Sequence, residues 1–471
     1  MPGAAHTGLP FLCHNGLMLH VPGPLKPIAA ILQSAGYHCY LVGGAVRDMV
    51  AGRSVTDLDL ATDAPPQTVM KLFRRVIPSG IEHGTVTILF KGKPYEITTF
   101  RTERDYHDGR RPQQVEFCAS IEEDLARRDF TINGMALEIP DGQLVDPFDG
   151  RGDVKRRLIR AIGNAEERFS EDSLRLMRAV RFALQLDFAI ESRTFSAIQR
   201  HAAGITRVSA ERIRDELTRM LATPQPAGGF RLLRQASLLE HVLPELLEGI
   251  GVEQDSAVAS DVFEHLLLSV NGPAPERLDI RWAALLHDIA KPRCRATLDN
   301  GAVHFHGHDE MSAQMAAEIL SRLRYPKRLV EHVAHLIRHH MFDYQRQWSD
   351  AAVRRFVARV GIDAIDDLLL LRAADTFGKT GQRRSDQQIS ELRRRIDVVQ
   401  QEQHAITIAD LALNGSDLQR EIGIPPSRDM GTVLRFLLET VLEDPALNQR
   451  ERLLEIAERF YRERIAGPRQ A

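Results

Sequence analysis

The chain has 471 residues, a length that suggests about three domains rather than one. Hydrophobic residues make up 43% and charged residues 27% of the sequence, which is typical of a globular protein and excludes a disordered or fibrous chain. The N-terminal residues lack a cationic start and a sustained apolar run, so we expect neither a signal peptide nor a membrane span, and a cytoplasmic location. The four cysteines form no C-x-x-C pair and give no support to a disulfide framework.

The formal net charge of −3 does not indicate a nucleic-acid-binding protein. The distribution of charge matters more than its sum. Residues 151 to 181 contain nine Lys or Arg against five Asp or Glu, a local excess that could neutralise phosphates or could only be a solvated helix face.

The first chemical signal follows a short apolar strand at residues 40 to 42. Gly43 and Gly44 let the backbone turn and approach a ligand closely, and Arg47 lies in the helix expected after them. A strand, a glycine pair and a helix in this order are typical of a nucleotide site.

Two alternating acids, Asp57 and Asp59, come next, and residues two apart on a strand face the same side. Paired carboxylates suit Mg²⁺, which binds one or two carboxylates together with substrate phosphates. Glu96 alternates with apolar neighbours on a later predicted strand and could supply a third carboxylate, although a surface glutamate would show the same pattern. The predicted chemistry is metal-assisted phosphoryl or nucleotidyl transfer, with Asp57, Asp59 and Glu96 as catalytic residues.

The segments GGAVRD (43–48) and DLDLAT (57–62) resemble the signature of class II tRNA nucleotidyltransferases, the CCA-adding enzymes and their poly(A) polymerase relatives. RRDFTIN (127–133) matches a further family motif. The resemblance implies an α+β fold: an N-terminal nucleotidyltransferase (polymerase beta-like) mixed sheet with helices, followed by all-helical neck, HD and tail domains. The domains expected are the head at 22–145, the neck at 146–250, the HD domain at 251–380 and the tail at 381–471.

The resemblance also assigns nucleotide-binding roles. Gly44, Arg47 and Arg128 would hold the triphosphate, since an arginine fork can bind phosphate oxygens bidentately; an ion pair between Arg128 and Asp129 is the alternative. The polar segment 101–115 contains DGRRP, which in the family accompanies addition of the terminal A. It favours full CCA addition or A addition alone.

A helical run at residues 171 to 181 resembles the family's EDxxR motif. Asp172 and Arg175 are three residues apart and would be neighbours on one helix. An aspartate accepts hydrogen bonds and an arginine only donates, so the pair fits the pairing edges of cytosine and adenine and rejects uracil and guanine. Arg178 and Arg181 are expected to contact phosphate or tRNA. Farther on, Arg212 could steady the catalytic strand region, or could serve packing alone.

Nine of the eighteen histidines lie between residues 261 and 345. The order of the expected ligands resembles the HD superfamily of metal-dependent phosphohydrolases. They are His265, His287, Asp288 and Asp375, with His308 and His339 or His340 as ligands of a possible second metal. The resemblance implies a divalent transition metal that activates water, and phosphodiesterase or phosphatase activity.

The tail resembles the family's tRNA-elbow-binding region and would act as a ruler that stops growth after three nucleotides. The expected function is template-independent addition of CCA to tRNA 3′ ends from CTP and ATP, with two Mg²⁺ ions on Asp57 and Asp59. The expected partners are tRNA and the two nucleotides, with neither a membrane nor a protein partner. The alternatives are an A-adding enzyme or poly(A) polymerase, and an HD hydrolase whose head only binds RNA.

Overall fold

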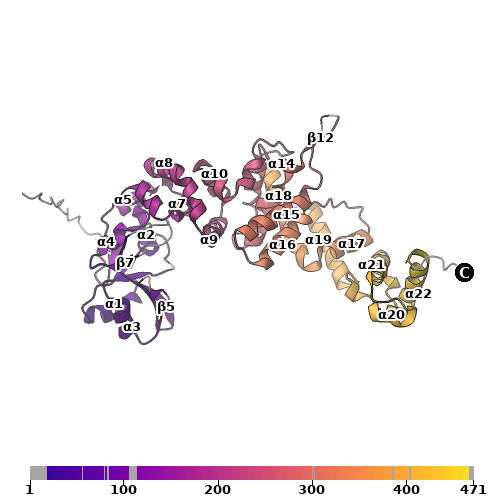
Figure 1. The fold of residues 1–471 in the computed structure, drawn as a ribbon, viewed down its shortest axis with the longest axis horizontal. Coiled ribbons are helices and arrows are strands. Elements are labelled where there is room, and N and C mark those ends of the chain that lie inside the picture. The colour runs from indigo at the N-terminus through magenta and orange to yellow at the C-terminus, as the bar shows by residue number, and fades with distance from the viewer. Residues whose placement is uncertain are drawn as a thin grey trace, which may run out of the picture. The chain divides into compact units, whose positions relative to one another are not determined.

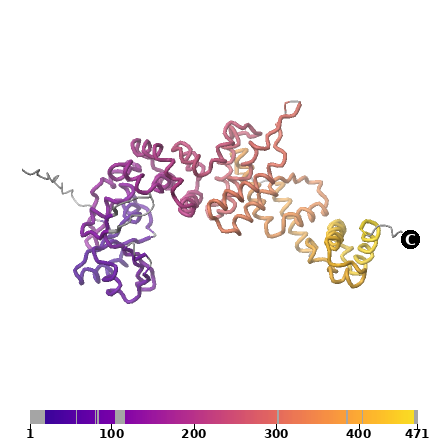
Figure 2. Tube along the Cα trace, viewed as in Figure 1, coloured from indigo at the N-terminus to yellow at the C-terminus, as the bar shows by residue number. Residues whose placement is uncertain are grey.

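The structure is a computed structural model that describes residues 19–55, 57–78, 80–81, 84–104, 114–299, 301, 303–383, 387–402 and 405–465. The chain divides into two compact units, Met1–Pro244 and Glu245–Ala471. Figures 1 and 2 follow the chain through both units by colour. Each unit is described by itself.

A seven-stranded mixed sheet forms the head of the first unit, in the order β3-β4-β5-β2-β1-β8-β9. Only β2 and β5 pair in parallel; the other neighbours are antiparallel. The strands are β1 (Tyr40–Val42), β2 (Leu60–Thr62), β3 (Val76–Ile77), β4 (Thr85–Phe90), β5 (Lys93–Thr99), β8 (Ala136–Glu138) and β9 (Leu144–Val145). The sheet confirms the predicted α+β head.

Four helices accompany this sheet: α1 (Leu25–Ser34), α2 (Gly44–Val50), α3 (Pro66–Leu72) and α4 (Ile121–Ala126) (Figure 1). The apolar spacing of α1 puts Leu25, Ile28 and Leu32 on one buried face. A hairpin of β6 (Arg101–Arg104) and β7 (Gln114–Phe117) extends from the head. The DGRRP pattern at 108–112 lies outside the described residues.

The neck consists mainly of helices: α5 (Gly150–Arg156), α6 (Ala165–Glu171), α7 (Leu174–Leu186), α8 (Ser192–His201), α9 (Ala210–Leu221), α10 (Ala227–Gln235) and α11 (Leu239–Val242). It is not all-helical, because β10 (Leu158–Ile159) and β11 (Ala189–Ile190) form a small parallel sheet. Arg157 and Asp187 end α5 and α7 in the left-handed conformation, with φ of 56° and 58°. Each turns the chain out of its helix and into one of these strands.

The second unit begins with α12 (Val262–Ser269), α13 (Leu278–Leu286), α14 (Lys291–Cys294), α15 (His308–Arg322), α16 (Lys327–Arg338), α17 (Asp350–Val360) and α18 (Ile365–Thr380). A short hairpin of β12 (Ala296–Thr297) and β13 (Val303–His304) interrupts the helices. Helix α13 is buried almost all round, with Trp282 and Arg281 fully enclosed, and α12 packs against α18. Ligand candidates on these helices are therefore held within a packed interior.

The tail contains α19 (Gln387–Gln401), α20 (Gly415–Ile422), α21 (Arg428–Glu443) and α22 (Arg450–Phe460), drawn in orange to yellow in Figure 2. Leu418, Val433, Leu437 and Leu453 belong to a hydrophobic core made by this region itself. Asn414 is the N-cap of α20 and forms a capping box with Asp417. The four-domain division remains a prediction. No helix among the described residues has the length and apolar character needed to cross a membrane.

Candidate active site

A cavity of about 540 Å³ opens in the first unit between the head and helices α7 and α9. Eight arginines and three aspartates line it, so the cavity is suited to a polyanion. The charged lining residues are Arg47, Asp59, Arg127, Arg128, Asp129, Asp172, Arg175, Arg178, Arg181, Arg212 and Arg219. All seven residues predicted from the sequence to bind a nucleotide line the cavity together with Asp59: Gly44, Arg47, Arg128, Asp172, Arg175, Arg178 and Arg181.

The glycine pair provides room beside two guanidinium groups. Gly43 has φ of +72°, and a Cβ there would lie 3.3 Å from Nη1 of Arg128. A Cβ on Gly44, the first residue of α2, would lie 3.5 Å from Nη2 of Arg47. The backbone therefore approaches the cavity closely at a point where larger residues would crowd its arginines.

The two alternating acids precede β2 instead of lying on it, which corrects the expectation from the sequence. Strand β2 begins at Leu60, and only the carbonyl of Asp59 continues the pairing, by accepting a hydrogen bond from the Val42 amide at 3.0 Å. Glu96 lies on β5, where Ile97 pairs with Leu60. The carboxylates thus come from the coil before one strand and from its parallel neighbour.

Asp59 lies near enough to Glu96 and Asp57 for their charges to affect its carboxyl group. Desolvation raises the pKa of Asp59, the charges of Glu96 and Asp57 raise it further, and Arg128 opposes them. Carboxylates that raise one another's pKa repel, and a divalent cation would relieve that repulsion. The oxygen donor set therefore fits a hard metal ion, and the catalytic role of Glu96 remains a prediction.

A chain of hydrogen bonds joins the head to α7. Arg47 Nη1 donates to Asn133 Oδ1 at 3.0 Å, and Asn133 Nδ2 donates to Asp129 Oδ1 at 3.1 Å. Arg178 Nε and Nη2 donate to the other oxygen of Asp129 at 2.8 and 2.6 Å. Burial alone would raise the pKa of Asp129, but Arg178, Asn133 and the Phe130 amide lower it to about 2. The chain fixes two of the cavity's arginines.

Arg128 does not pair with Asp129, the alternative that the sequence left open. Its Nη2 contacts Asp124 of α4 at 3.1 Å, and Arg127 donates to the same carboxylate at 2.8 Å. Asp124 is buried, and both arginines remain part of the cavity lining. Asp124 therefore fixes the position of Arg128, which lines the cavity, without lining the cavity itself.

The EDxxR spacing predicts that Asp172 and Arg175 lie on one helix, but in the structure they do not share a helix. Helix α6 ends at Glu171, Asp172 is extended (φ −141°, ψ 102°), and α7 begins at Leu174. Arg175 Nη1 donates to Glu171 Oε2 at 2.6 Å and to the Arg168 carbonyl, and its Nη2 donates to the Arg127 carbonyl. A guanidinium has five N–H donors, so this arginine keeps donors for a ligand.

Arg178 and Arg181 differ from each other in their surroundings. Arg181 is 5% exposed, pairs with Glu216 of α9 at 2.5 Å and donates to Gln185 at 2.7 Å. Its guanidinium also lies over the Phe182 ring, 4.0 Å from the centroid. A phosphate or RNA contact by Arg181 fits this geometry poorly, because the side chain is engaged in packing α7 against α9. Arg178 lines the cavity and is partly exposed.

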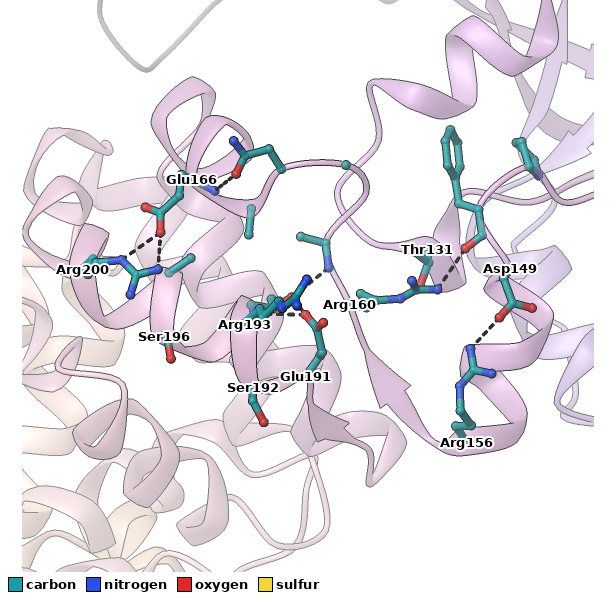
Figure 3. A pocket seen from close by; sticks show the side chains of 18 residues that line it. Thr131, Asp149, Arg156, Arg160, Glu166, Glu191, Ser192, Arg193, Ser196 and Arg200 are labelled. Atoms are coloured by element: carbon teal, nitrogen blue, oxygen red, sulfur yellow. Dashed lines mark hydrogen bonds and ion pairs between the residues drawn. The ribbon is translucent and has the colours of Figure 1, made fainter. Parts of the chain in front are cut away.

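A second cavity, of about 1060 Å³, lies elsewhere in the neck (Figure 3). Figure 3 shows Arg200 directed at Glu166 and Arg156 at Asp149, and Arg156 donates to Asp149 Oδ2 at 2.6 Å. Two of its four arginines, Arg156 and Arg200, are thus paired with acids of the same cavity. None of the predicted nucleotide-binding residues lines it.

The second unit brings the four predicted HD residues together in its interior. His265, His287, Asp288 and Asp375 are all buried, and one ligand atom from each lies within 4.8 Å of the others. Nε2 of His265 lies 3.1 Å from Nε2 of His287 and 3.2 Å from Oδ1 of Asp375. Burial alone would lower the pKa of His287, but Asp288 and Asp375 raise it to about 9.

Asp288, His308 and His340 form a second group within the same distance limit. His308 Nε2 and His340 Nε2 lie 3.1 and 3.5 Å from Asp288 Oδ1, while Oδ2 of the same carboxylate faces His287. These three atoms have no hydrogen-bond partner among the described residues. His308, His340 and His287 each direct Nδ1 at a backbone carbonyl, at 2.6 to 3.0 Å, so Nε2 is the ring nitrogen that faces the other ligand atoms.

Of the two adjacent histidines proposed for the second metal, only His340 belongs to this group. His339 is the C-cap of α16 and its ring packs on His335, with centroids 4.6 Å apart. Burial, with further contributions from His335 and the nearby arginines, lowers its pKa to about 4. A third group, of Asp279, His332 and Asp367, already contains a cation, because Arg277 Nη2 lies 2.9 and 2.5 Å from its two carboxylates.

The sequence missed three residues of these sites. Asp129 and Asn133 belong to the RRDFTIN motif, but the sequence indicates Asp129 only as an alternative partner of Arg128 and gives Asn133 no role. Lys291 lies three residues after Asp288 in sequence, and its Nζ lies 2.6 Å from Asp288 Oδ2. The available sequence signal was that all three are polar or charged residues within or close to a recognised motif.

Comparison with known proteins agrees with this arrangement. Residues 39–160 match a family model described as poly A polymerase head domain, 187–249 one described as probable RNA and SrmB-binding site of polymerase A, and 305–457 one described as tRNA nucleotidyltransferase domain 2, putative. The fold and the cavity thus define a nucleotidyltransferase-type head with a helical extension.

Individual relatives extend the match over the chain. A CCA-adding enzyme of Lactobacillus johnsonii is 48% identical over 216 residues, which is 46% of this chain and 54% of that protein, so the match spans about half the length of this curated relative. The crystal structure of the Bacillus stearothermophilus CCA-adding enzyme in complex with CTP is 30% identical, covers 93% of this chain and 98% of its own, and superposes with a TM-score of 0.69. The Thermotoga maritima CCA-adding enzyme complexed with tRNA is similar in fold, with 20% identity, coverage of 93% and 95%, and a TM-score of 0.54. The chain belongs to the CCA-adding enzyme family.

Proposed function

We propose that the protein adds CCA to the 3′ end of tRNA from CTP and ATP, without a template. The observation that carries the proposal is a single arginine-lined cavity that holds Asp59, Asp172 and Arg175 together. The names of the relatives support it, since similar proteins are CCA-adding enzymes and one was crystallised with CTP.

The chain's own residues divide the work within the cavity. Gly43 and Gly44 let the triphosphate approach the backbone, and Arg47, Arg128 and Arg178 neutralise its charge. Asp57, Asp59 and Glu96 would hold Mg²⁺, which supplies activation of the terminal hydroxyl and charge stabilisation on the phosphates.

Base choice follows from donors and acceptors. Cytosine and adenine both offer an amine donor beside a ring-nitrogen acceptor, whereas uracil and guanine offer a carbonyl beside a ring N–H. Asp172 can accept from the amine, and Arg175 can donate to the ring nitrogen. A wrong base would leave desolvated polar groups unpaired, which is a strong means of discrimination. One protein surface would thus serve both nucleotides.

Incubation with tRNAs that end before CCA, after C and after CC tests the proposal, with each nucleotide supplied singly and together. We expect two C additions from CTP, one A addition to the CC end from ATP, and no growth beyond CCA. Addition of A alone would identify an A-adding enzyme, and long A tails a poly(A) polymerase. No addition at all would leave the HD hydrolase with an RNA-binding head.

We further propose a separate metal-dependent phosphohydrolase site in the second unit. Two buried ligand groups share Asp288, one oxygen toward each, and their unpaired nitrogen and oxygen atoms fit two divalent transition metals. When bound, such metals supply an activated water. Lys291 neutralises Asp288 and is positioned to bind a phosphate at the site.

The resemblance to HD enzymes suggests phosphomonoesters and 2′,3′-cyclic phosphates as substrates. The separation of the two sites can be tested with one variant in each. Asp59→Ala should abolish nucleotide addition and leave hydrolysis of a 2′,3′-cyclic nucleotide unchanged, whereas His287→Ala should do the reverse. Loss of both activities from either change would contradict two independent sites. A cytoplasmic location and tRNA binding by the tail remain predictions.

A further inference from the structure

Asp172 is held by a residue from a helix that is distant in sequence. Its Oδ2 accepts a hydrogen bond from Nη2 of Arg212 in α9 at 2.8 Å, and its Oδ1 accepts one from the Leu174 amide at 3.0 Å. Each oxygen therefore has one partner and keeps a lone pair. Because Asp172 is extended and lies between two helices, no regular backbone structure fixes its side chain.

Two residues on one face of α9 contact α7 and the residues just before it. Arg212 contacts Asp172 just before α7, and Glu216, one turn along α9, contacts Arg181 within α7 at 2.5 Å. Glu216 is 3% exposed, whereas the Arg212 side chain is 38% exposed at the cavity. The inner contact packs the helices, and the outer one reaches the cavity.

The arrangement keeps Asp172 and Arg175 apart. On one helix, an aspartate and an arginine three residues apart can form an ion pair with each other. The hydrogen-bonding groups engaged in that ion pair would be less available to a nucleotide base. Here Arg175 pairs with Glu171 at 2.6 Å, and Asp172 pairs with Arg212 at 2.8 Å. Each of the two residues thus has a different ion-pair partner.

We propose that Arg212 is a positioning residue for nucleotide selection: it holds the Asp172 carboxylate toward the base and away from Arg175. The inference rests on the proposed function. It replaces the expectation that Arg212 steadies the catalytic strand, because Arg212 forms its ion pair with Asp172. Removal of Arg212 would free the Asp172 carboxylate to pair with Arg175. Cytosine and adenine would then lose a hydrogen-bond acceptor for their amine, and uracil and guanine would be rejected less strongly.

The ratio of kcat/KM for CTP to that for UTP, measured on tRNA lacking CCA, tests the role. Arg212→Ala should lower this ratio about 10- to 100-fold, the range in which one polar partner discriminates between ligands. Arg212→Lys, which keeps a cation on the same helix, should restore part of the ratio. Arg214→Ala is the matched control, because Arg214 lies on α9 and pairs with Asp215 at 2.9 Å.

Two further measurements separate positioning from folding. In an Asp172→Asn background, Arg212→Ala should cause little further loss of the ratio, since the two residues act as one unit. The thermal midpoints of Arg212→Lys and the wild type should agree, so that this variant reports selection even if Arg212→Ala folds poorly. An unchanged CTP-to-UTP ratio in both Arg212 variants would overturn the inference while leaving CCA addition intact. Failure of the wild type to prefer CTP would instead overturn the proposed function.

Discussion

Nε2 of His308 lies 3.1 Å from Oδ1 of Asp288, and neither atom forms a hydrogen bond among the described residues. Buried polar atoms without partners are costly, and a metal ion between them would remove that cost. His340 directs a third such atom at the same oxygen, 3.5 Å away. Whether this site binds two metal ions or one therefore depends on the second ligand group, Asp288, His308 and His340.

His308→Ala and His340→Ala should each reduce the bound transition metal from about two ions per chain to about one. The first group, with His265 and His287, keeps all four of its ligands in both variants. Metal content after dialysis, measured by elemental analysis, is the readout. His339→Ala is the control, because His339 is adjacent in sequence but packs on His335. Equal metal content in all three variants would contradict a second site.

Gly43→Ala should lower kcat/KM for CTP by at least about tenfold, because the added Cβ approaches Arg128 and φ is +72°. Gly52→Ala is matched to it, since φ is +67° but no atom lies within 4 Å of the added Cβ. Both variants should lose about 1 kcal/mol of stability from backbone strain. Only Gly43→Ala should lose activity. Equal kinetic losses would show that strain, not the cavity, is responsible.

The ion pair of Asp129 with Arg178 should make stability depend on pH in acid. The folded pKa of Asp129 is about 2, below its ordinary value of 3.8, so its contribution is complete above pH about 4 and is lost as pH falls toward 2. The shift corresponds to about 2 kcal/mol. Unfolding of Asp129→Asn by urea should thus show a weaker pH dependence between pH 4 and 2 than the wild type. Parallel curves would contradict the assignment.

Much of both sites could be predicted because their residues lie within short motifs. Strand β1 matches the expected residues 40–42, and the His287-Asp288 pair, expected as metal ligands from the resemblance to the HD superfamily, lies in a group of possible metal ligands. Residues on one continuous segment have their relative positions fixed by local geometry, so a motif carries that information.

The remaining features depend on contacts between distant segments. The break between α6 and α7 separates Asp172 from the helix of Arg175, although the spacing suited one continuous helix. Likewise, the choice between His339 and His340 is made where α16 ends, since the last turn decides which ring faces Asp288. Side-chain direction at a helix end follows from backbone angles that composition does not specify.

The most direct test of the central claim is a crystal structure of the protein with CTP bound. We predict that the cytosine amine lies about 3 Å from an Asp172 carboxylate oxygen, with the ring nitrogen at a similar distance from an Arg175 N–H. The triphosphate should lie beside Gly43 and Arg128, on the side of Asp59. A cytosine whose pairing edge faces away from Asp172 and Arg175 would contradict the account.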